Sequence, residues 1–188
     1  MRHNVSGQDQ VPETDAGSQR NPFSKMKIRS LTPSEWRLFR DFRLNALKST
    51  AGVYLTSYAE AAARSEDDWR ALLAPERQQI FGLFDGDRLI GITAVFTLQE
   101  DPSTAMLAMS FIDPAYRRRR LSRLLFEARL DWARQRKFRR VVVSHRGSNA
   151  ASMRAIRAFG FQPIGKSPRT WPDGTTEDEI SYELCLTA

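Results

Sequence analysis

The sequence contains one cysteine and two histidines among 188 residues. Cys185 has no partner within the chain for a disulfide, and we expect it to be a buried strand residue of a protein from a reducing compartment. His3 lies in a polar N-terminal segment, and His145 stands alone. A zinc site needs several such ligands close together, so no resident metal is expected.

Long apolar runs are also absent. No stretch approaches the roughly twenty apolar residues that span a membrane, and the N-terminus lacks the apolar core of a signal peptide. We therefore expect a soluble, cytoplasmic protein with no membrane partner. Residues 1–25 are polar, with almost nothing to bury, and are expected to form a disordered tail. Residues 26–188 are long enough for one domain with a sizeable core.

Positive charge is concentrated in one part of the chain. Residues 117–157 contain 14 Arg and Lys against 2 Asp and Glu, a net charge of +12, whereas the remainder has 15 against 20, a net charge of −5. A local field of one sign attracts a polyanion. The overall charge of +7 permits nucleic-acid binding but does not argue for it, because the aromatic-interleaved basic motif of an RNA-binding sheet is missing.

The basic segment follows a strand pattern and opens a helix pattern. Residues 105–112 are apolar apart from Ser110, which indicates a strand, and Asp113-Pro114 ends it because proline cannot donate to a ladder. Beyond the turn, apolar residues recur at helical spacing with charged residues between them. These apolar residues are Leu121, Leu124, Leu125, Ala128 and Trp132.

The turn between this strand and this helix is suited to binding a phosphate group. The first turn of a helix has free backbone N–H groups and the positive end of the helix dipole, and such an end holds phosphate. Guanidinium groups add permanent charge and match phosphate oxygens in shape. Those around the turn belong to Arg117, Arg118, Arg119, Arg120 and Arg123.

In this order of strand, basic turn and helix, residues 105–161 resemble the core of the GNAT N-acetyltransferase superfamily. That family binds the pyrophosphate of acetyl-CoA in a turn of the form Q/R-x-x-G-x-G/A. Arg117 stands at the Q/R place, Arg120 at the first glycine, and Ser122 at the second Gly or Ala. A positive φ at Arg120 would strain the turn, whereas a negative φ would leave its N–H available.

The resemblance extends to later segments and to the whole fold. Asn149 and Gly160-Phe161 match the family's N-x(10)-G-F spacing, and Asp173-Gly174 with Asp178-Glu179 match a pattern common near its end. Strand patterns cluster early and late, with helices crossing between them, which predicts an α+β fold with a mixed central sheet and helices on both faces. The resemblance sharpens this to the GNAT fold. The predicted strands are 27–31, 79–84, 88–96, 105–112, 138–145, 161–166 and 178–186, with a turn region at 167–177.

The resemblance implies acetyl-CoA as co-substrate and indicates which residues would hold it. Backbone groups of Ser110, Phe111 and Ile112 would pair with the pantetheine arm like an added strand, and the N–H of Ile112 would polarise the thioester carbonyl. Asn149 would bind the arm, cap the last helix, or do both. The pyrophosphate would be held by the turn residues Arg117, Arg118, Arg119, Arg120, Leu121, Ser122 and Arg123.

In this family an amine attacks the thioester directly, so the amine must first lose a proton to a base or a water chain. Some members carry a glutamate base where this chain has Ser144, and often a tyrosine acid where it has Ile156. Strand alternation places His145 on the opposite face from Ser144. The sequence leaves the catalytic residues unassigned, with Ser144, Glu60 and Tyr182 as the candidates.

The acceptor is expected to be a small-molecule or peptide amine. Tyr54 and Tyr58 lie in residues 50–60, which help to wall the acceptor site in the family. One alternative is a non-catalytic acyl-CoA-binding module, suggested by Ser144 and Ile156. Another is a nucleic-acid or ribosome-associated protein, which would use Arg134, Arg136, Lys137, Arg139 and Arg140. The oligomeric state is open, a homodimer included.

Overall fold

The computed structural model describes residues 26–186, so the predicted disordered tail at residues 1–25 lies outside the described residues. Seven strands form one sheet in the order β1-β2-β3-β4-β5-β7-β6. The strands are β1 (Met26–Ser30), β2 (Gln78–Asp85), β3 (Arg88–Thr97), β4 (Thr104–Ile112), β5 (Arg140–Arg146), β6 (Gln162–Thr170) and β7 (Thr176–Cys185). The helices are α1 (Trp36–Ser49), α2 (Tyr58–Ala62), α3 (Glu66–Leu72), α4 (Ser122–Gln135) and α5 (Ala150–Ala158), with short 3-10 turns η1 (Pro33–Glu35) and η2 (Pro114–Tyr116).

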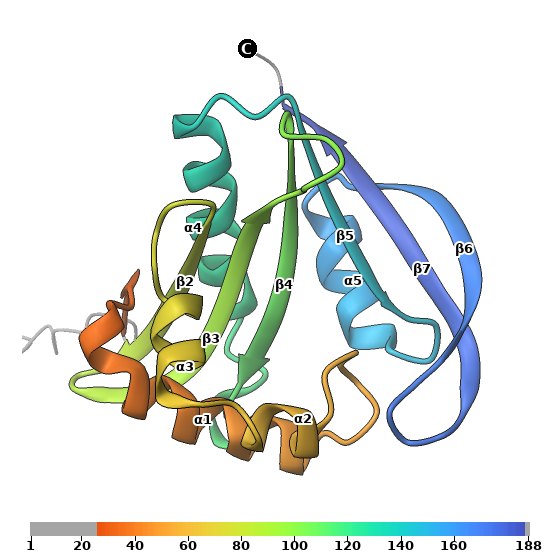
Figure 1. The fold of residues 1–188 in the computed structure, drawn as a ribbon. Coiled ribbons are helices and arrows are strands. Elements are labelled where there is room, and N and C mark those ends of the chain that lie inside the picture. Colours follow the sequence, from red (N-terminus) through yellow and green to blue (C-terminus); the bar gives the residue numbers. More distant parts are fainter. Residues whose placement is uncertain (1–25, 187–188) are drawn as a thin grey trace, which may run out of the picture.

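Helices cover both faces of the sheet, as Figure 1 shows, with α1 to α3 on one face and α4 and α5 on the other. On the first face, Phe39 and Trp69 meet edge to face over the sheet, with ring centroids 5.6 Å apart. On the second, Phe126 of α4 stacks on Phe159, with ring centroids 4.6 Å apart. The prediction of an α+β fold with a mixed, two-sided sheet is therefore confirmed. None of the helices in residues 26–186 is long and apolar enough to cross a membrane.

The sheet divides in the middle, between β4 and β5. These two strands run parallel and pair only through residues 104–107 and 140–143. All the other strand pairs in the described sheet are antiparallel. Beyond Leu107 and Val143 the strands separate, and Figure 1 shows β4 and β5 diverging toward the end where α2 lies. Among residues 26–186, no strand pairs with this edge of β4 beyond Leu107.

A bulge in β4 lies beside this separation. Ile92 of β3 pairs with Phe111, but Ala94 pairs with Ala108, so β4 carries an extra residue between them. Met109 takes the left-handed backbone conformation there, with φ of 56°. Such a bulge bends a strand and redirects its backbone groups, which helps β4 to leave β5.

The helix starts follow capping signals in the sequence. The side chain of Asn149 accepts a hydrogen bond from Ser152 N at 3.0 Å and so caps α5, as one of the two roles predicted for it. Helix α2 was not predicted, although Ser57 and Glu60 have the spacing of a capping box. In the structure Ser57 N donates to the carboxylate of Glu60 at 2.7 Å, and Glu60 N donates to Ser57 Oγ at 3.1 Å.

The region predicted as a long turn at residues 167–177 is mostly strand. Strand β6 continues to Thr170 and β7 begins at Thr176, leaving a loop closed by Trp171 N and Thr175 O at 2.8 Å. Pro168 suggested a break, but in the described sheet β6 is an edge strand paired with β7 alone, where proline is tolerated. Cys185, expected to be buried, is exposed at the end of β7.

Candidate functional site

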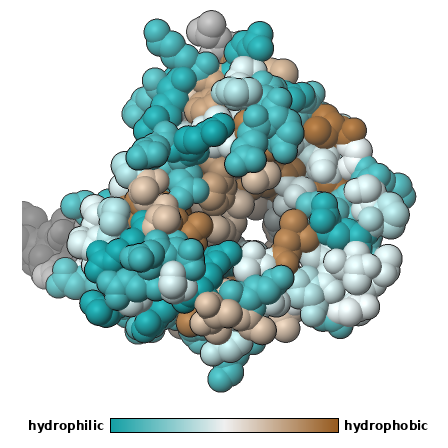
Figure 2. Space-filling model, in the orientation of Figure 1, coloured by the Kyte–Doolittle hydropathy of each residue, from teal (hydrophilic) through white to brown (hydrophobic). Residues whose placement is uncertain are grey.

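A cleft of about 560 Å³ occupies the space between the diverging strands. Its walls come from β4, β5, α4, α5 and the loop after α1, and Figure 2 shows an opening through the molecule in this region. Predicted site residues that line it are Tyr54, Ser110, Phe111, Ile112, Arg117, Ser122, Ser144 and Asn149. Segments far apart in the sequence thus meet at one site.

The turn that enters α4 borders the wide end of this cleft. Arg118 and Arg120 both take left-handed conformations, with φ of 63° and 57°, so the positive φ considered for Arg120 is what the structure shows. The backbone N–H groups of residues 118–122 have no bonding partner among the described residues. Consecutive N–H groups in a turn that alternates in handedness form a concave anion site, and the dipole of α4 adds positive potential.

The arginine side chains of this turn are exposed. Arg117 donates from Nε to Ile112 O at 3.1 Å, and Arg119 donates weakly to Ala115 O at 3.4 Å. Arg123 differs, because its Nε lies 2.6 Å from Glu127 and its backbone N–H already donates to Arg120 O at 3.1 Å. The exposed side chain of Arg120 leaves the turn open to a ligand.

The free edge of β4 already carries two side-chain hydrogen bonds. Tyr54 Oη donates to Ser110 O at 2.7 Å, and Arg117 Nε donates to Ile112 O. A carbonyl oxygen has two lone pairs, so each can accept a second hydrogen bond from a ligand lying along the edge. Phe111, between them, pairs with Ile92 of β3 and packs into the core.

Tyr54 is held by a buried arginine from α1. The guanidinium carbon of Arg43 lies 4.4 Å from the centre of the Tyr54 ring. Burial raises the pKa of Tyr54, and burial lowers the pKa of Arg43 to about 10. Both groups therefore keep their protons at neutral pH. Tyr54 is thus fixed between Arg43 of α1 and the bulge of β4, and its hydroxyl lies at the cleft.

Ser144 is not alone on its face of β5. Its hydroxyl donates to the carboxylate of Glu179 on β7 at 2.5 Å, and Arg169 Nε donates to the other oxygen of that carboxylate at 2.5 Å. Glu179 is buried, with 8% of its surface exposed. The Glu179 carboxylate is therefore hydrogen-bonded to Ser144, the residue found where some family members carry a glutamate.

The other candidates for proton transfer lie elsewhere. Tyr182 is buried among apolar residues and its hydroxyl is 3.4 Å from His145 Nε2. His145 is on the opposite face of β5 from Ser144, as the strand alternation predicted, and its Nδ1 bonds to Arg146 O at 2.7 Å. Glu60 is exposed and caps α2; hydrogen bonds from the Ser57 backbone and side chain lower the pKa of this carboxyl.

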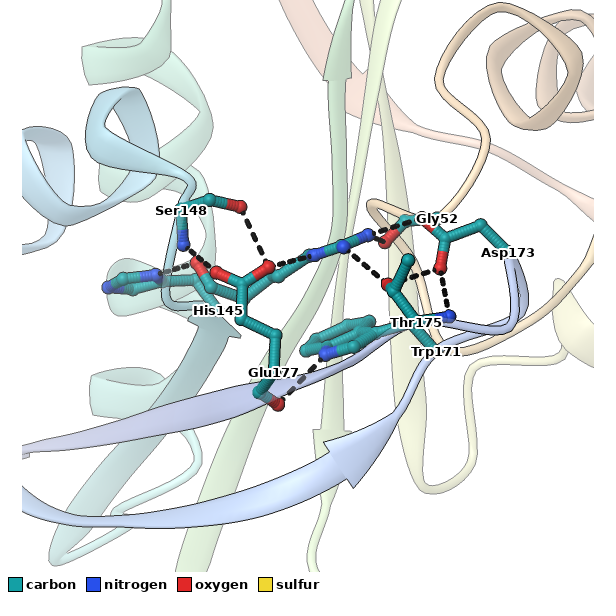
Figure 3. Close-up of polar contacts among 8 residues, drawn as sticks. Gly52, His145, Ser148, Trp171, Asp173, Thr175 and Glu177 are labelled. Carbon is teal, nitrogen blue, oxygen red and sulfur yellow. Dashed lines mark hydrogen bonds and ion pairs between the residues drawn. The ribbon is translucent and has the colours of Figure 1, made fainter.

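Arg146, at the end of β5, joins three segments that the sequence keeps apart. Its guanidinium donates to Gly52 O at 2.9 Å, to Asp173 at 2.7 Å and to Glu177 at 2.5 Å (Figure 3). Glu177 also accepts hydrogen bonds from the backbone and hydroxyl of Ser148. Arg146 therefore ties the loop after α1 to the β6–β7 hairpin directly, and Glu177 links this pair to the start of α5.

These contacts explain the charge states in the network. Hydrogen bonds to Asp173 and Glu177 raise the pKa of Arg146. The Arg146 guanidinium lowers the pKa of Asp173 to about 2 and lowers the pKa of Glu177. All three groups stay charged across the neutral range.

Gly52 is fitted to this network. Its φ is +76°, and a Cβ placed there would lie 2.2 Å from Asp173 Oδ2 and 2.7 Å from Arg146 Nη1. A side chain cannot be added without moving both charged groups. The close approach of the loop backbone to the ion pair therefore requires glycine.

A second pocket of about 440 Å³ adjoins the cleft on the side of this loop. Tyr54 lines both spaces, whereas Tyr58 lines only the second among the described residues, and its side chain is exposed. Asp173 and Pro172 of the β6–β7 hairpin complete the wall. The two tyrosines predicted to contact an acceptor thus border one pocket, and a carboxylate borders it with them.

The basic residues that suggested a nucleic-acid surface are mostly engaged by the protein itself. Arg134 pairs with Asp131 at 3.1 Å, and Arg140 pairs with Glu183 at 3.3 Å. Arg136 donates to Pro75 O at 3.3 Å and lies over the Trp132 ring. Their positive charge is therefore partly compensated within the domain.

Two residues of the site were not assigned by the sequence alone. Glu179 belongs to the Asp178-Glu179 pattern, but its contact with Ser144 depends on how β7 aligns with β5. Arg146 was visible only as the residue before the asparagine segment. The available signal was the spacing of Glu177 and Glu179, which places both carboxylates on one face of a strand, but the predicted strand began only at residue 178, whereas β7 begins at Thr176.

Several solved structures have a fold similar to that of this chain. The structure is similar to an acetyltransferase of the GNAT family from Streptococcus pneumoniae (TM-score 0.74, 18% identity, 86% of this chain and 99% of that one). It is also similar to yncA from Salmonella typhimurium, solved with its cofactor acetyl-CoA (TM-score 0.73, 18% identity, 87% and 95%). A third similar structure is spermidine N-acetyltransferase from Vibrio cholerae in complex with CoA and spermine (TM-score 0.69, 16% identity, 86% and 96%).

At these identities the structural likeness establishes the fold alone. No curated protein matches the sequence significantly. The model of the acetyltransferase (GNAT) family matches residues 38–161, which include α1, the divergent strands, the basic turn and α5. The predicted resemblance is thereby confirmed, and the chain belongs to the GNAT acetyltransferase family.

Proposed function

We propose that this protein transfers an acetyl group from acetyl-CoA to the primary amine of a small molecule, an amino acid derivative or a peptide. The observation that carries the proposal is the position of the α4 amino end. Arg117 and Ser122, which flank the free N–H groups of the turn, line the cleft between β4 and β5, and Arg118, Arg119 and Arg120 form no ion pair among the described residues. A diphosphate at that end would extend its pantetheine arm along the free edge of β4.

The residues of the cleft fit acetyl-CoA. Residues 118–122 would hold the diphosphate through backbone N–H groups, and Ser110 and Ile112 would pair with the arm. Asn149 lines the cleft, but its side-chain oxygen already caps α5, so its amide NH₂ group is the part available to the arm. The bound group supplies a thioester, whose acyl carbon an amine can attack.

Glu179 is the proton acceptor that we propose, acting through Ser144. The Ser144 hydroxyl lines the cleft and donates to the Glu179 carboxylate at 2.5 Å. A proton taken from the amine by a water or by Ser144 can pass to this carboxylate. The pair would replace the glutamate that some family members carry at the position of Ser144.

Tyr54 is the donor that we propose for the departing thiol. Its hydroxyl is protonated, reaches Ser110 O at 2.7 Å and lines the cleft beside the bulge. The usual tyrosine position is Ile156, which is buried with 1% exposure and has no proton to give. A thiolate of pKa about 8.5 also accepts a proton from water, so loss of Tyr54 should slow transfer rather than abolish it.

The acceptor that we propose is a cationic amine. Asp173 borders the smaller pocket, and together with Tyr54 and Tyr58 it offers a carboxylate and two aromatic rings, which suit an ammonium group. Among the similar structures, one is a complex with spermine and another is a ribosomal-protein-S18-alanine N-acetyltransferase. These support polyamines and peptide N-termini as the first compounds to screen.

A two-step experiment tests the proposal. Acetyl-CoA should raise the melting temperature of the wild-type protein through binding to the folded state. Release of free thiol from acetyl-CoA should then depend on an amine from the screen. Glu179→Gln should lower kcat by on the order of a hundredfold while leaving the acetyl-CoA shift intact.

Two results would contradict the proposal in different ways. Absence of an acetyl-CoA shift would remove the donor site. A normal shift with no thiol release across polyamines, amino acid derivatives and peptides would favour the non-catalytic acyl-CoA-binding module.

A further inference from the structure

Arg129, on α4, is a buried cation for which the described residues provide no carboxylate. Only 1% of its surface is exposed. Its Nε donates to Leu125 O at 2.9 Å, and its guanidinium carbon lies 4.5 Å from the centre of the Phe126 ring. Its Nη2 is buried without a hydrogen-bond partner among the described residues.

The charge of Arg129 is therefore uncompensated. Burial alone lowers its pKa to about 9, so the group is still a cation at neutral pH. Leaving a charge buried without a partner is strongly destabilising. Arg146 shows the contrast, because two carboxylates surround it. A protein that keeps such a residue beside a ligand cleft has a candidate for ligand recognition.

Arg129 borders the narrow end of the cleft. Leu107 and Val143, the last residues that pair β4 with β5, line this end together with Arg129. Ser122, at the amino end of α4, lines the wide end, seven residues or roughly 10 Å away along the helix. A ligand with its diphosphate at Ser122 and its arm along β4 would direct its acyl group toward Arg129.

We propose that Arg129 recognises acyl-CoA donors whose short acyl chain ends in a carboxylate, such as a succinyl group. The inference rests on the proposed function, since it requires the acyl-CoA orientation given above. The terminal carboxylate would accept hydrogen bonds from the Arg129 guanidinium, whose Nη2 has no partner among the described residues, and would neutralise the buried charge. Acetyl-CoA would bind in the same cleft but would leave that charge unpaired.

The same bonds break and form, and the same number of protons moves, for acetyl-CoA and for a donor with a terminal carboxylate. The C–S bond of the thioester breaks and a C–N bond forms to the amine. The amine gives up one proton and the CoA thiol gains one, without a redox change. Donors with a terminal carboxylate would therefore change the product and leave the chemistry of the step unaltered.

A carboxylate could also come from an amino acid acceptor. The acyl chain is favoured, because Arg129 lies on α4 whereas the smaller pocket is walled by Tyr58 and Asp173 on the other side of the sheet. Binding measured without any acceptor separates these sources.

Calorimetric titration of the full chain with CoA, butyryl-CoA and succinyl-CoA tests the inference. Butyryl and succinyl chains have four carbons each and differ in the terminal carboxylate. Wild-type protein should bind succinyl-CoA on the order of tenfold more tightly than butyryl-CoA, as expected for a hydrogen bond between charged groups. Arg129→Met should remove that difference and retain the affinity for CoA.

Arg134→Met, an exposed position on the same helix, is the matched control and should preserve the difference. Equal affinity of wild-type protein for the two donors would overturn the inference, whether or not the methionine variant folds. A difference that persists in a folded Arg129→Met variant would also overturn it. Failure of wild-type protein to bind CoA at all would instead overturn the proposed function.

Discussion

The arginines on the two walls of the wide end of the cleft, one set after β4 and the other at the end of β5, are used in opposite ways. At the α4 turn, Arg118, Arg119 and Arg120 are exposed and form no ion pair among the described residues. At the end of β5, Arg146 is surrounded by Asp173, Glu177 and a backbone carbonyl. All of these residues are arginines. Those of the turn can still pair with an anionic ligand, whereas Arg146 is already paired with two carboxylates.

This difference predicts that the arginines of the turn act in ligand binding, whereas Arg146 holds parts of the structure in place. A guanidinium without a carboxylate nearby retains its attraction for phosphate, and its loss should alter donor affinity. Arg146 instead fixes the relative positions of a loop, a helix start and a hairpin, and its loss should alter the acceptor side. The experiments below test this division in order of decreasing effect.

Replacing Arg146 should have the largest effect. Arg146→Ala would free the loop that contains Gly52 and leave two carboxylates without their cation. Displacement of substrate-positioning groups can cost on the order of a hundredfold in rate, so kcat/KM for the amine should fall by about that factor. The dissociation constant for CoA should change little.

Arg140→Ala is the control for this change. Arg140 lies on the same strand and pairs with Asp101 and Glu183 at the opposite end. The Arg140→Ala change should lower the melting temperature without raising the KM for the amine. Arg146→Lys should recover only part of the activity, since an ammonium group cannot replace a forked donor. Equal kinetic losses in the Arg146 and Arg140 variants would refute a specific positioning role.

Charge reversal at the α4 turn should affect donor binding. Arg119→Glu should weaken CoA binding by on the order of tenfold, because Arg119 forms no ion pair among the described residues and lies near the proposed diphosphate site. Arg123→Glu should have a smaller effect, since Arg123 already pairs with Glu127 at 2.6 Å. Affinities measured at two salt concentrations would check this, because the Arg119 contribution should shrink as salt rises. Identical losses for the two variants would contradict the distinction.

The acid stability of the protein should depend on Asp173. Its pKa is about 2 in the folded state, against about 3.9 in an unfolded chain. A lowered pKa stabilises the fold above the unfolded value, and this contribution is lost as pH falls from about 4 toward 2. Asp173→Asn should therefore make the melting temperature fall less steeply over that range.

Asp101 provides a matched comparison for the acid experiment. Hydrogen bonds from Ser103 and Thr104 lower its pKa to about 2 as well. Asp101→Asn should flatten the same acid transition while leaving the KM for the amine unchanged. An unaltered transition in the Asp173 variant would show that its ion pair with Arg146 does not form in solution.

The smallest effect is expected at the backbone of the turn. Arg120→Gly relieves a left-handed conformation that costs a residue with a Cβ about 1 kcal/mol, but glycine also raises the entropy of the unfolded chain. The net stability change should stay within about 1 kcal/mol, whereas Arg119→Gly, at a residue without positive φ, should only destabilise. Denaturant titration compares the two, and a greater loss for Arg120→Gly would contradict the assignment of strain.

The sequence predicted those parts of the fold that depend on local patterns. The apolar run of β4, the helical spacing of α4 and the cap at Asn149 each need only neighbouring residues. The hairpin of β6 and β7 was predicted too short, because Pro168 reads as a break unless β6 is known to be an edge strand. Edge position depends on the order of strands in the sheet.

The candidate site shows the same limit. The turn at Arg117 and Ser122 was located from a short motif. The Ser144–Glu179 pair and the contacts of Arg146 join residues that are 27 to 94 positions apart in sequence. Alternation along a strand gives the face of each carboxylate, but not which arginine or serine the register brings opposite to it.

The divergence of β4 and β5 has a kinetic consequence. The cleft is lined by Phe126 and Arg129 from one face of the sheet and by Ser144 and Arg146 from the other, and Figure 2 shows an opening through the molecule in this region. Under the proposed function, donor and acceptor would enter from opposite sides and be present together. Initial-rate plots for the two substrates should then intersect rather than run parallel, because no group on the protein has to carry the acyl chain between half-reactions.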